Sequence, residues 1–206
     1  MSAPLIVTAL RLEAALISSA APRLPVRRVG MGPDRSRAAV ESLSRHDASA
    51  LIVLGVCGGL VQSDRPGEVI VADQVRACDE HGQPTDPAVP CWGSGMLTDA
   101  LKQRGLMARS GTIASSPRIV HGAERDRLSR WGADAVEMES AWLAAAARGR
   151  PFAVIRVFAD TPNAEFKRPV RALDGWLRAS LYLHRTARAL QEILRERELS
   201  DLLDEQ

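Results

Sequence analysis

The stretch Ala50-Leu51-Ile52-Val53-Leu54-Gly55-Val56 is the most strongly apolar run of the chain, and it leads directly into Cys57-Gly58-Gly59. A continuous apolar run of this length, rich in branched residues, is typical of a buried strand. Glycines directly after the strand allow the backbone to approach a ligand closely, or simply to turn tightly against a neighbouring helix. The stretch therefore predicts a central strand whose carboxyl end is a candidate site.

Similar short apolar runs alternate with stretches of helical periodicity along the rest of the chain. Strands are expected at 5–10, 26–29, 68–72, 108–114, 134–138 and 151–158, and helices at 11–19, 33–44, 95–104, 121–131 and 140–148. Residues 79–95 are polar and rich in proline, and they predict a long surface loop. The C-terminal segment predicts one helix with an apolar stripe of Leu173, Leu177 and Leu181 that continues through Leu183, Ala187, Leu190 and Leu194.

Strands that alternate with helices over the full length predict an α/β fold for residues 1–206 as one domain. The expected sheet is central, twisted, mixed and largely parallel, with helices on its flanks. Ligands of such sheets bind beyond the carboxyl ends of the strands. That rule directs attention to residues 11–13, 57–59 and 137–140 and to Asp160.

Composition argues against several classes of protein. Hydrophobic residues make up 46% and charged residues 25% of the 206, which is ordinary for a globular domain. The net charge of +2 gives no excess that would indicate general nucleic-acid binding. No apolar run approaches the roughly 20 residues of a membrane span, and the N-terminus has no pattern of a secretory signal.

The cysteines and histidines indicate neither disulfide bonds nor a structural zinc site. The three cysteines Cys57, Cys78 and Cys91 are an odd number, and a chain of this size can fold without disulfides. We therefore expect reduced thiols in a cytoplasmic protein. CxxC and HxxxH spacings do not occur, so no structural zinc site is expected.

Four acidic residues are candidates for chemistry. Val136-Glu137-Met138-Glu139-Ser140 places two carboxylates at the end of an apolar strand, where one could accept hydrogen bonds from a ribose diol or compensate a helix N-terminus. Asp160 ends the last strong strand and could act as an acid or base, or cap the turn before Thr161-Pro162. Glu13 by itself is an ordinary acid in the first turn of a helix.

Gly30-Met31-Gly32 could present N–H groups to an anion, but it does not fit the dinucleotide-binding fingerprint.

Together these residues occur in the order and spacing of a known family. TALRLE (8–13), GVCGGL (55–60), RPGEVIVAD (65–73), VEMES (136–140) and RVFAD (156–160) resemble the nucleoside phosphorylase / methylthioadenosine–adenosylhomocysteine nucleosidase superfamily. The VEMES and PGEVIVAD stretches are the most specific parts. Within the superfamily the chain looks most like the hopanoid-associated nucleosidase/phosphorylase branch, which acts on adenosylhopane.

The resemblance implies roles for individual residues. Asp160 would protonate or hydrogen-bond N7 of a purine, and Glu13 would orient or activate the attacking water. Glu139 would hold the ribose hydroxyls, with Met138 packed against the sugar. The other expected substrate-binding residues are Glu137, Cys57, Gly58, Phe158, Arg118 and Ile119. No metal or organic cofactor is implied, and the implied assembly is a homodimer that takes a small-molecule nucleoside.

Several positions depart from the family pattern. Val53 and Val56 stand where phosphorylases present an arginine and a serine to phosphate, and they cannot bind an anion. Arg118 stands where nucleosidases often stack an aromatic side chain on the base, and Ala159 replaces a serine that orients the aspartate. The expected reaction is therefore hydrolysis of an adenine-type nucleoside that carries a 5′ substituent.

Two alternatives remain open. Phosphorolysis could use Gly30–Gly32, Arg11 or Arg118 as a substitute anion site. A protein that only binds a nucleoside would explain the lost serine and aromatic side chain, but not why Glu13, Glu139 and Asp160 are all present.

Overall fold

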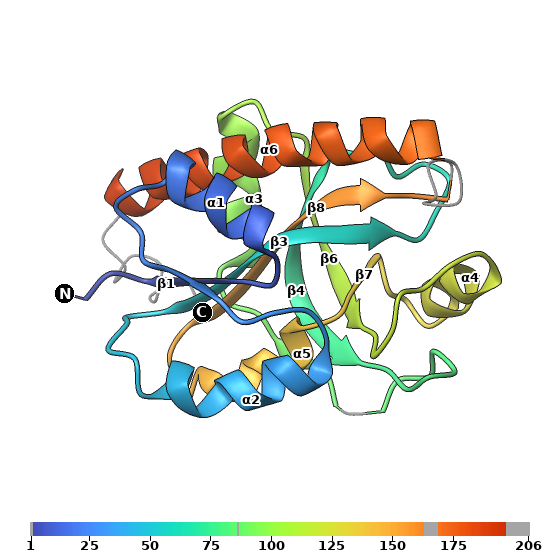
Figure 1. Ribbon diagram of the computed structural model, residues 1–206, viewed down its shortest axis with the longest axis horizontal. Helices are drawn as coiled ribbons and strands as arrows, with labels where there is room; N and C mark the ends of the chain where they lie inside the picture. Colours follow the sequence, from blue (N-terminus) through green and yellow to red (C-terminus); the bar gives the residue numbers. More distant parts are fainter. Residues whose placement is uncertain (1, 86, 163–168, 197–206) are drawn as a thin grey trace.

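A sheet lies between two layers of helices in the computed structural model, which describes residues 2–85, 87–162 and 169–196 (Figure 1). On one side are α1 (Arg11–Ala20), α3 (Ser94–Gln103) and α6 (Pro169–Glu196). On the other side are α2 (Pro33–Ser44) and α5 (Ser140–Leu143), and α4 (Ala123–Arg130) lies beside the ends of the strands. The expected α/β architecture is confirmed.

Within the described ranges, eight strands form the sheet. They are β1 (Leu5–Thr8), β2 (Val26–Arg28), β3 (Leu51–Gly59), β4 (Val69–Ala77), β5 (Val89–Pro90), β6 (Ala108–Ser115), β7 (Ala135–Glu137) and β8 (Phe152–Asp160). The pairs β1–β2, β1–β3, β3–β8, β4–β6 and β6–β7 are parallel, whereas β3–β7, β4–β5 and β4–β8 are antiparallel. Because β3, β8, β4, β6 and β7 pair in a closed ring, the mixed and largely parallel sheet curls into a barrel-like shape.

Most elements begin and end within two residues of the expected positions, and the exceptions have physical reasons. β3 continues to Gly59 because Gly58 and Gly59 pair with β7, so these glycines extend the strand that they were expected to end. β4 continues to Ala77 beside β6. The expected surface loop at 79–95 contains β5, which pairs with β4, and its residue 86 lies outside the described residues.

The expected alanine-rich helix at 140–148 is shorter than predicted. α5 ends at Leu143 and continues only as a 3₁₀ turn, η1 (Ala144–Ala146). Arg148 then adopts a left-handed φ of 47°, which an α-helix cannot continue through. The Arg150 side chain donates hydrogen bonds to the carbonyls of Ala146 and Ala147, which fixes this early end.

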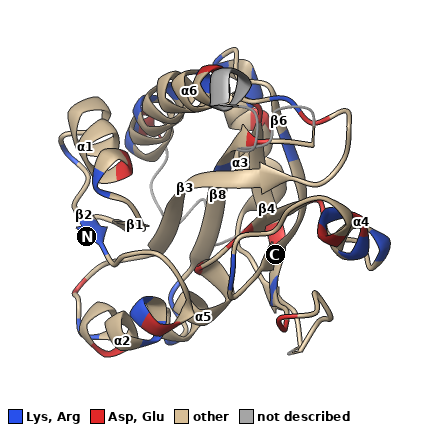
Figure 2. Cartoon of the chain, turned by 45° about the vertical axis from the view of Figure 1, so that its right-hand side comes forward, with Lys and Arg blue, Asp and Glu red and all other residues tan. Residues whose placement is uncertain are grey.

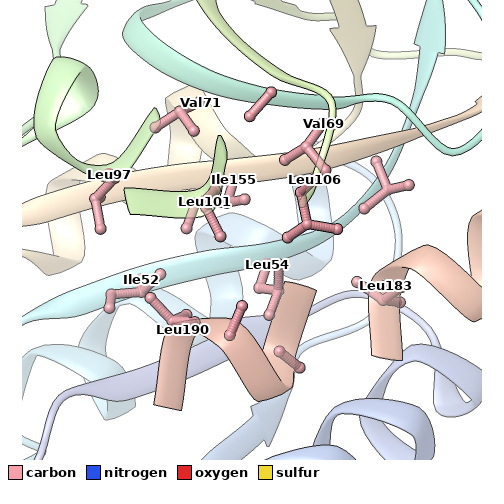
Figure 3. Close-up of a cluster of buried hydrophobic side chains, with 14 of the residues drawn as sticks. Ile52, Leu54, Val69, Val71, Leu97, Leu101, Leu106, Ile155, Leu183 and Leu190 are labelled. Atoms are coloured by element: carbon pink, nitrogen blue, oxygen red, sulfur yellow. The ribbon is translucent and has the colours of Figure 1, made fainter. Parts of the chain in front are cut away.

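Apolar side chains from the strands and from the α1–α3–α6 layer form the larger core (Figure 3). Its labelled members are Ile52, Leu54, Val69, Val71, Leu97, Leu101, Leu106, Ile155, Leu183 and Leu190. A second core lies on the α2–α5 side. Charged residues of both signs are spread over the helices and loops (Figure 2). Among the described helices, none has the length and apolarity that crossing a membrane requires.

The apolar stripe expected on α6 is divided between two faces of the helix. Leu183, Ala187 and Leu190 are buried, whereas Leu173, Leu177 and Leu181 are 63%, 62% and 59% exposed. A step of two residues, such as that from Leu181 to Leu183, turns about 200° around a helix axis, so the two sets cannot share one face. The prediction of one continuous stripe was wrong. Residues 197–206 of the predicted helix lie outside the described residues.

Replacing leucines from the two faces of α6 tests this division. We expect Leu190→Ala to lower the free energy of unfolding by about 2–5 kcal/mol, because it leaves a cavity in the core. Leu177→Ala is the matched control, and we expect a change within about 0.5 kcal/mol, because the side chain is exposed. Urea titration of both variants measures the difference, and equal losses would contradict the orientation of α6.

Candidate active site

A cavity of about 220 Å³ lies at the carboxyl ends of β1, β3, β7 and β8. All but one of the residues predicted for the site line it, namely Glu13, Cys57, Gly58, Arg118, Ile119, Glu137, Met138, Glu139 and Asp160. The other lining residues are Ala9, Leu10, Met31, Val56, Val120, Arg125, Val136, Arg156, Ala159 and Trp176. Residues from four strand ends therefore meet in one space.

Phe158 is the predicted residue that does not line the cavity. Its side chain is fully buried in the core with Val154 and Ile113. The guanidinium of Arg109 lies over its ring, 5.1 Å from the centroid. Phe158 is therefore part of the core that supports the site, and the structure does not place it against a ligand.

Glu13 is held in place by hydrogen bonds to both of its carboxylate oxygens. Oε2 accepts from Thr8 Oγ1 at 2.7 Å and from the backbone N–H of Leu10 at 2.8 Å, which satisfies the start of α1. Oε1 accepts from the N–H of Val56 on β3 at 2.8 Å. Glu13 thus combines the helix-start role that its position suggested with a place in the cavity wall.

Arg156 is a fully buried cation on β8 that binds two of the acidic residues. Its Nη2 donates to Glu137 Oε2, to Glu139 Oε2 at 3.3 Å and to Ser140 Oγ at 3.0 Å. Burial alone would lower the pKa of Arg156, but the carboxylates of Glu137, Glu139 and Glu13 raise it above its usual value. The guanidinium therefore stays charged and joins the carboxylates into one network.

Gly55 makes room for this network on the neighbouring strand. A Cβ at position 55 would lie 2.7 Å from Arg156 Nη1 and 2.8 Å from Glu13 Oε1. Any side chain would separate the two charged groups, so close approach explains the glycine here.

Glu137 is bound entirely by the protein around it. Its carboxylate accepts hydrogen bonds from Ser115 Oγ, from Ser140 Oγ at 2.9 Å and from the N–H groups of Glu139 and Ser140 at 3.0 and 2.9 Å. These N–H groups belong to the start of α5, so the helix N-terminal role that the sequence allowed is the one that the geometry shows.

Glu139 reaches across the cavity floor to a different helix. Its Oε1 accepts a hydrogen bond from the N–H of Gly32 at 3.1 Å, at the start of α2. Gly32 has a φ of 95°, which favours glycine. Burial, reinforced by the nearby carboxylate of Glu137, raises the pKa of Glu139 to about 7, although Arg156 opposes the shift.

Asp160 pairs with an arginine that the sequence patterns did not single out. Arg125 on α4 is buried, and its Nη2 lies 2.5 Å from Asp160 Oδ2. The sequence contains only a weak indication that Arg125 is buried. Arg125 precedes Leu128 by three residues, so both side chains fall on the buried face of α4. Asp160 therefore takes part in a buried ion pair that the sequence patterns did not predict.

Arg118 lies at the rim of the cavity and is held by other groups. Its guanidinium binds both oxygens of Glu124 at 2.9 and 2.5 Å and the carbonyl of Glu80 at 2.7 Å. Ile119 beside it is 49% exposed. Arg118 thus joins α4 to the 79–85 segment at the entrance.

The buried ionisable groups of the cavity wall are mostly acidic. Four carboxylates (Glu13, Glu137, Glu139 and Asp160) face two guanidinium groups (Arg125 and Arg156). Burial raises the pKa of the Cys57 thiol, which is therefore neutral. Among the described residues, no group of three or more His, Cys, Asp or Glu side chains is arranged to hold a metal ion. Such a cavity favours a ligand that is neutral or becomes cationic over an anion.

Comparisons with known proteins identify the family and the fold. The family model of the phosphorylase superfamily matches residues 15–194. A search of curated proteins finds no match. A Helicobacter pylori MTAN mutant with 5′-methylthioadenosine in its active site shares 22% identity at a TM-score of 0.79, covering 96% of this chain and 100% of that one.

Two further solved structures have the same fold. The futalosine hydrolase of Helicobacter pylori strain 26695 shares 20% identity at a TM-score of 0.73, covering 100% of this chain and 98% of that one. The S-adenosylhomocysteine nucleosidase of Streptococcus pyogenes, in complex with 5-methylthiotubericidin, shares 23% identity at a TM-score of 0.72. The match covers 92% of this chain and 98% of that one.

The raised pKa of Glu139 gives a pH dependence of stability. Because its folded value of about 7 lies above the ordinary value of 4.5, its stabilising contribution is full below about pH 4.5 and is lost as the pH rises through 7. We expect Glu139→Gln, which mimics the protonated acid, to match the wild type at pH 4.5. At pH 8 the variant should be more stable by on the order of 1–3 kcal/mol.

Urea unfolding of both proteins at several pH values measures this difference. Glu41→Gln is the control, because Glu41 is exposed and paired only with the exposed Arg45 on α2. Its difference from the wild type should stay small at every pH. A Glu139→Gln difference that does not change between pH 4.5 and 8 would contradict a buried Glu139 whose charge Arg156 compensates only in part.

Proposed function

The chain belongs to the phosphorylase superfamily, and on this premise we propose that it hydrolyses the N-glycosidic bond of a purine nucleoside. The observation that carries the proposal is that Glu13, Glu139 and Asp160 line one cavity, each from a different strand end. These are the groups that such a cleavage requires: an acceptor for the ribose hydroxyls, a carboxylate beside the attacking water and an acid at the base.

The proposed reaction breaks the bond between C1′ and N9, and its electron pair leaves with the base. N7 of the base takes up a proton. It is proposed to come either from the protonated carboxyl group of Asp160 or from water, and in the second case the Asp160 carboxylate accepts a hydrogen bond from the new N7–H. The sugar becomes an oxocarbenium-like cation, which the buried carboxylates stabilise. Water, proposed to be oriented by Glu13, then adds to C1′ and gives up its proton to the Glu13 carboxylate, while Glu139 holds the hydroxyls and Met138 packs against the sugar.

Three features support water rather than phosphate as the nucleophile. The N–H of Val56 is occupied by Glu13, and the N–H of Gly32 is occupied by Glu139, so neither is available to an anion. Arg118 is paired with Glu124. A phosphate dianion would therefore enter a mostly acidic cavity without a matching cation, and burying an unpaired charge costs several kcal/mol.

The proposed substrate is an adenine-type nucleoside with a 5′ substituent. Leu10, Met31, Ile119 and Trp176 contribute apolar wall to the cavity, which suits a substituent without charge. Glu137, Cys57 and Gly58 are proposed to shape the sugar side, and Arg118 the rim. The proposed chemistry needs neither a metal nor an organic cofactor, because acid and carboxylate groups of the chain supply it.

We further propose that the chain works as a homodimer in the cytoplasm, as the family resemblance implies. The cytoplasmic proposal is supported by the free thiols of Cys57, Cys78 and Cys91. Sedimentation equilibrium of the purified chain tests the homodimer.

Product analysis tests the proposed reaction. Adenosine, 5′-methylthioadenosine, S-adenosylhomocysteine and futalosine are each incubated with the protein, with sodium chloride replacing phosphate at equal ionic strength. We expect release of the base at a rate that does not rise between zero and about 50 mM phosphate, because the cavity offers no counter-charge to the dianion. The sugar product should be unphosphorylated. Ribose 1-phosphate as the main product would favour phosphorolysis, and binding without cleavage would favour a nucleoside-binding protein.

A further inference from the structure

Arg125 is a buried cation in the cavity wall for which the proposed reaction has no role. We propose that Arg125 is the positioning residue of the base end of the site, which fixes the Asp160 carboxylate in its working orientation. The inference rests on the proposed function. It assigns to α4, which carries none of the family motifs, a direct influence on the rate of the reaction.

The guanidinium of Arg125 holds Asp160 by both its side chain and its main chain. Nη2 lies 2.5 Å from Oδ2, and Nη1 donates to the Asp160 carbonyl at 3.4 Å. Nη1 also donates to the carbonyl of Gly59, at the end of β3. The exposed fractions of the two side chains are 2% and 9%, so the pair is shielded from water. A planar guanidinium with several fixed donors sets direction as well as distance.

The strand itself does not fix the direction of Asp160. The parallel register of β3 and β8 shifts between Cys57 and Gly58, so that Cys57 pairs with Phe158 but Gly58 pairs with Asp160. The extra residue, Ala159, makes a bulge, and bulges redirect the side chains that follow them. Asp160 is also the last residue of β8. Its orientation therefore depends on a contact from outside the sheet, which Arg125 supplies.

Gly58 lies beside the guanidinium of Arg125. A Cβ at position 58 would lie 3.5 Å from Arg125 Nη1 and 3.2 Å from Val136 Cγ1. Position 58 is thus tight only against Val136 of the paired strand β7, and it lies in ordinary van der Waals contact with the guanidinium that binds Asp160.

The surroundings of Arg125 make a sharp experiment possible. Its side chain also lines a second cavity of about 580 Å³, together with Gln62, Asp126 and Arg130. Truncating Arg125 to alanine should open a guanidinium-sized gap beside Asp160 that a small solute can enter from this second cavity. Free guanidinium has the shape and charge of the missing group, whereas urea has the shape alone.

We expect Arg125→Ala to lower kcat about 100-fold, because misplacing a reacting group by about 1 Å has an effect of this size. KM should change less than about 3-fold, since the residue acts on the reacting acid rather than on binding. Guanidinium chloride up to about 50 mM, far below denaturing concentrations, should restore kcat at least 10-fold. Urea and sodium chloride at the same concentration should not, and Arg125→Lys should retain an intermediate kcat.

Two controls separate this role from a general loss of structure. Arg130→Ala removes an exposed arginine of the same helix that also lines the second cavity, and its kcat should equal that of the wild type. Arg125→Ala/Asp160→Asn should gain nothing from guanidinium, because the carboxylate to be positioned is absent. A raised KM with unchanged kcat, or equal restoration by sodium chloride, would overturn the proposal.

A stability cycle covers the case in which the wild type cleaves none of the nucleosides, which would refute the proposed function itself. Tm is then measured for Arg125→Ala, Asp160→Asn and the double variant. If the two groups act as a pair, the double variant loses less Tm than the sum of the single losses. Additive losses would overturn the pairing of Arg125 with Asp160, whatever the reaction is.

Discussion

The site depends on one buried guanidinium, that of Arg156, which has to satisfy carboxylates from different parts of the chain. Glu137 and Glu139 bind it directly, and Glu13 lies close enough to raise its pKa. Through these carboxylates Arg156 is linked to the start of α1, the start of α2 and the start of α5. Breaking a buried ion pair on one side leaves an uncompensated charge that costs about 3–5 kcal/mol. The positions of three helices relative to β8 are therefore set by charge as well as by apolar packing.

The contacts around Arg156 also explain why Glu137 and Glu139 have different roles. Glu137 uses its oxygens on Ser115, Ser140 and the first N–H groups of α5, so it is a structural anchor. Glu139 has fewer partners and carries a pKa of about 7, because burial and the charge of Glu137 outweigh the attraction of Arg156. A group in this state gains most when a hydroxyl or a developing positive charge comes near it. The excess of buried carboxylates is thus the property that connects the fold to the proposed cleavage.

Most strands and helices could be predicted from the sequence, because the hydrophobic patterns of period 2 and period 3.6 depend on residues that are close along the chain. The strand expected at 50–56, the helix at 33–44 and the position of Glu13, Glu139 and Asp160 at strand ends all followed from such patterns, whereas the extension of the strand to Gly59 did not. Contacts between distant residues could not be predicted in this way. Arg125 lies 35 positions from Asp160, and no pattern near Arg125 in the sequence predicts that the two side chains form an ion pair. The exposed Leu173, Leu177 and Leu181 were misjudged for the same reason, since only tertiary packing decides which face of a helix is covered.

The central claim is that a buried, mostly acidic cavity organised around Arg156 stabilises a sugar that becomes cationic. Calorimetric titration tests it most directly, with two adenine-type ligands that differ only in the sugar ring: a pyrrolidine that is protonated on its nitrogen, and the neutral tetrahydrofuran counterpart. We predict that the cationic ligand binds at least about 100-fold more tightly, as expected of a mimic of the transition state. Dissociation constants that agree within about 3-fold would contradict the claim, because the carboxylates would then give no preference for positive charge.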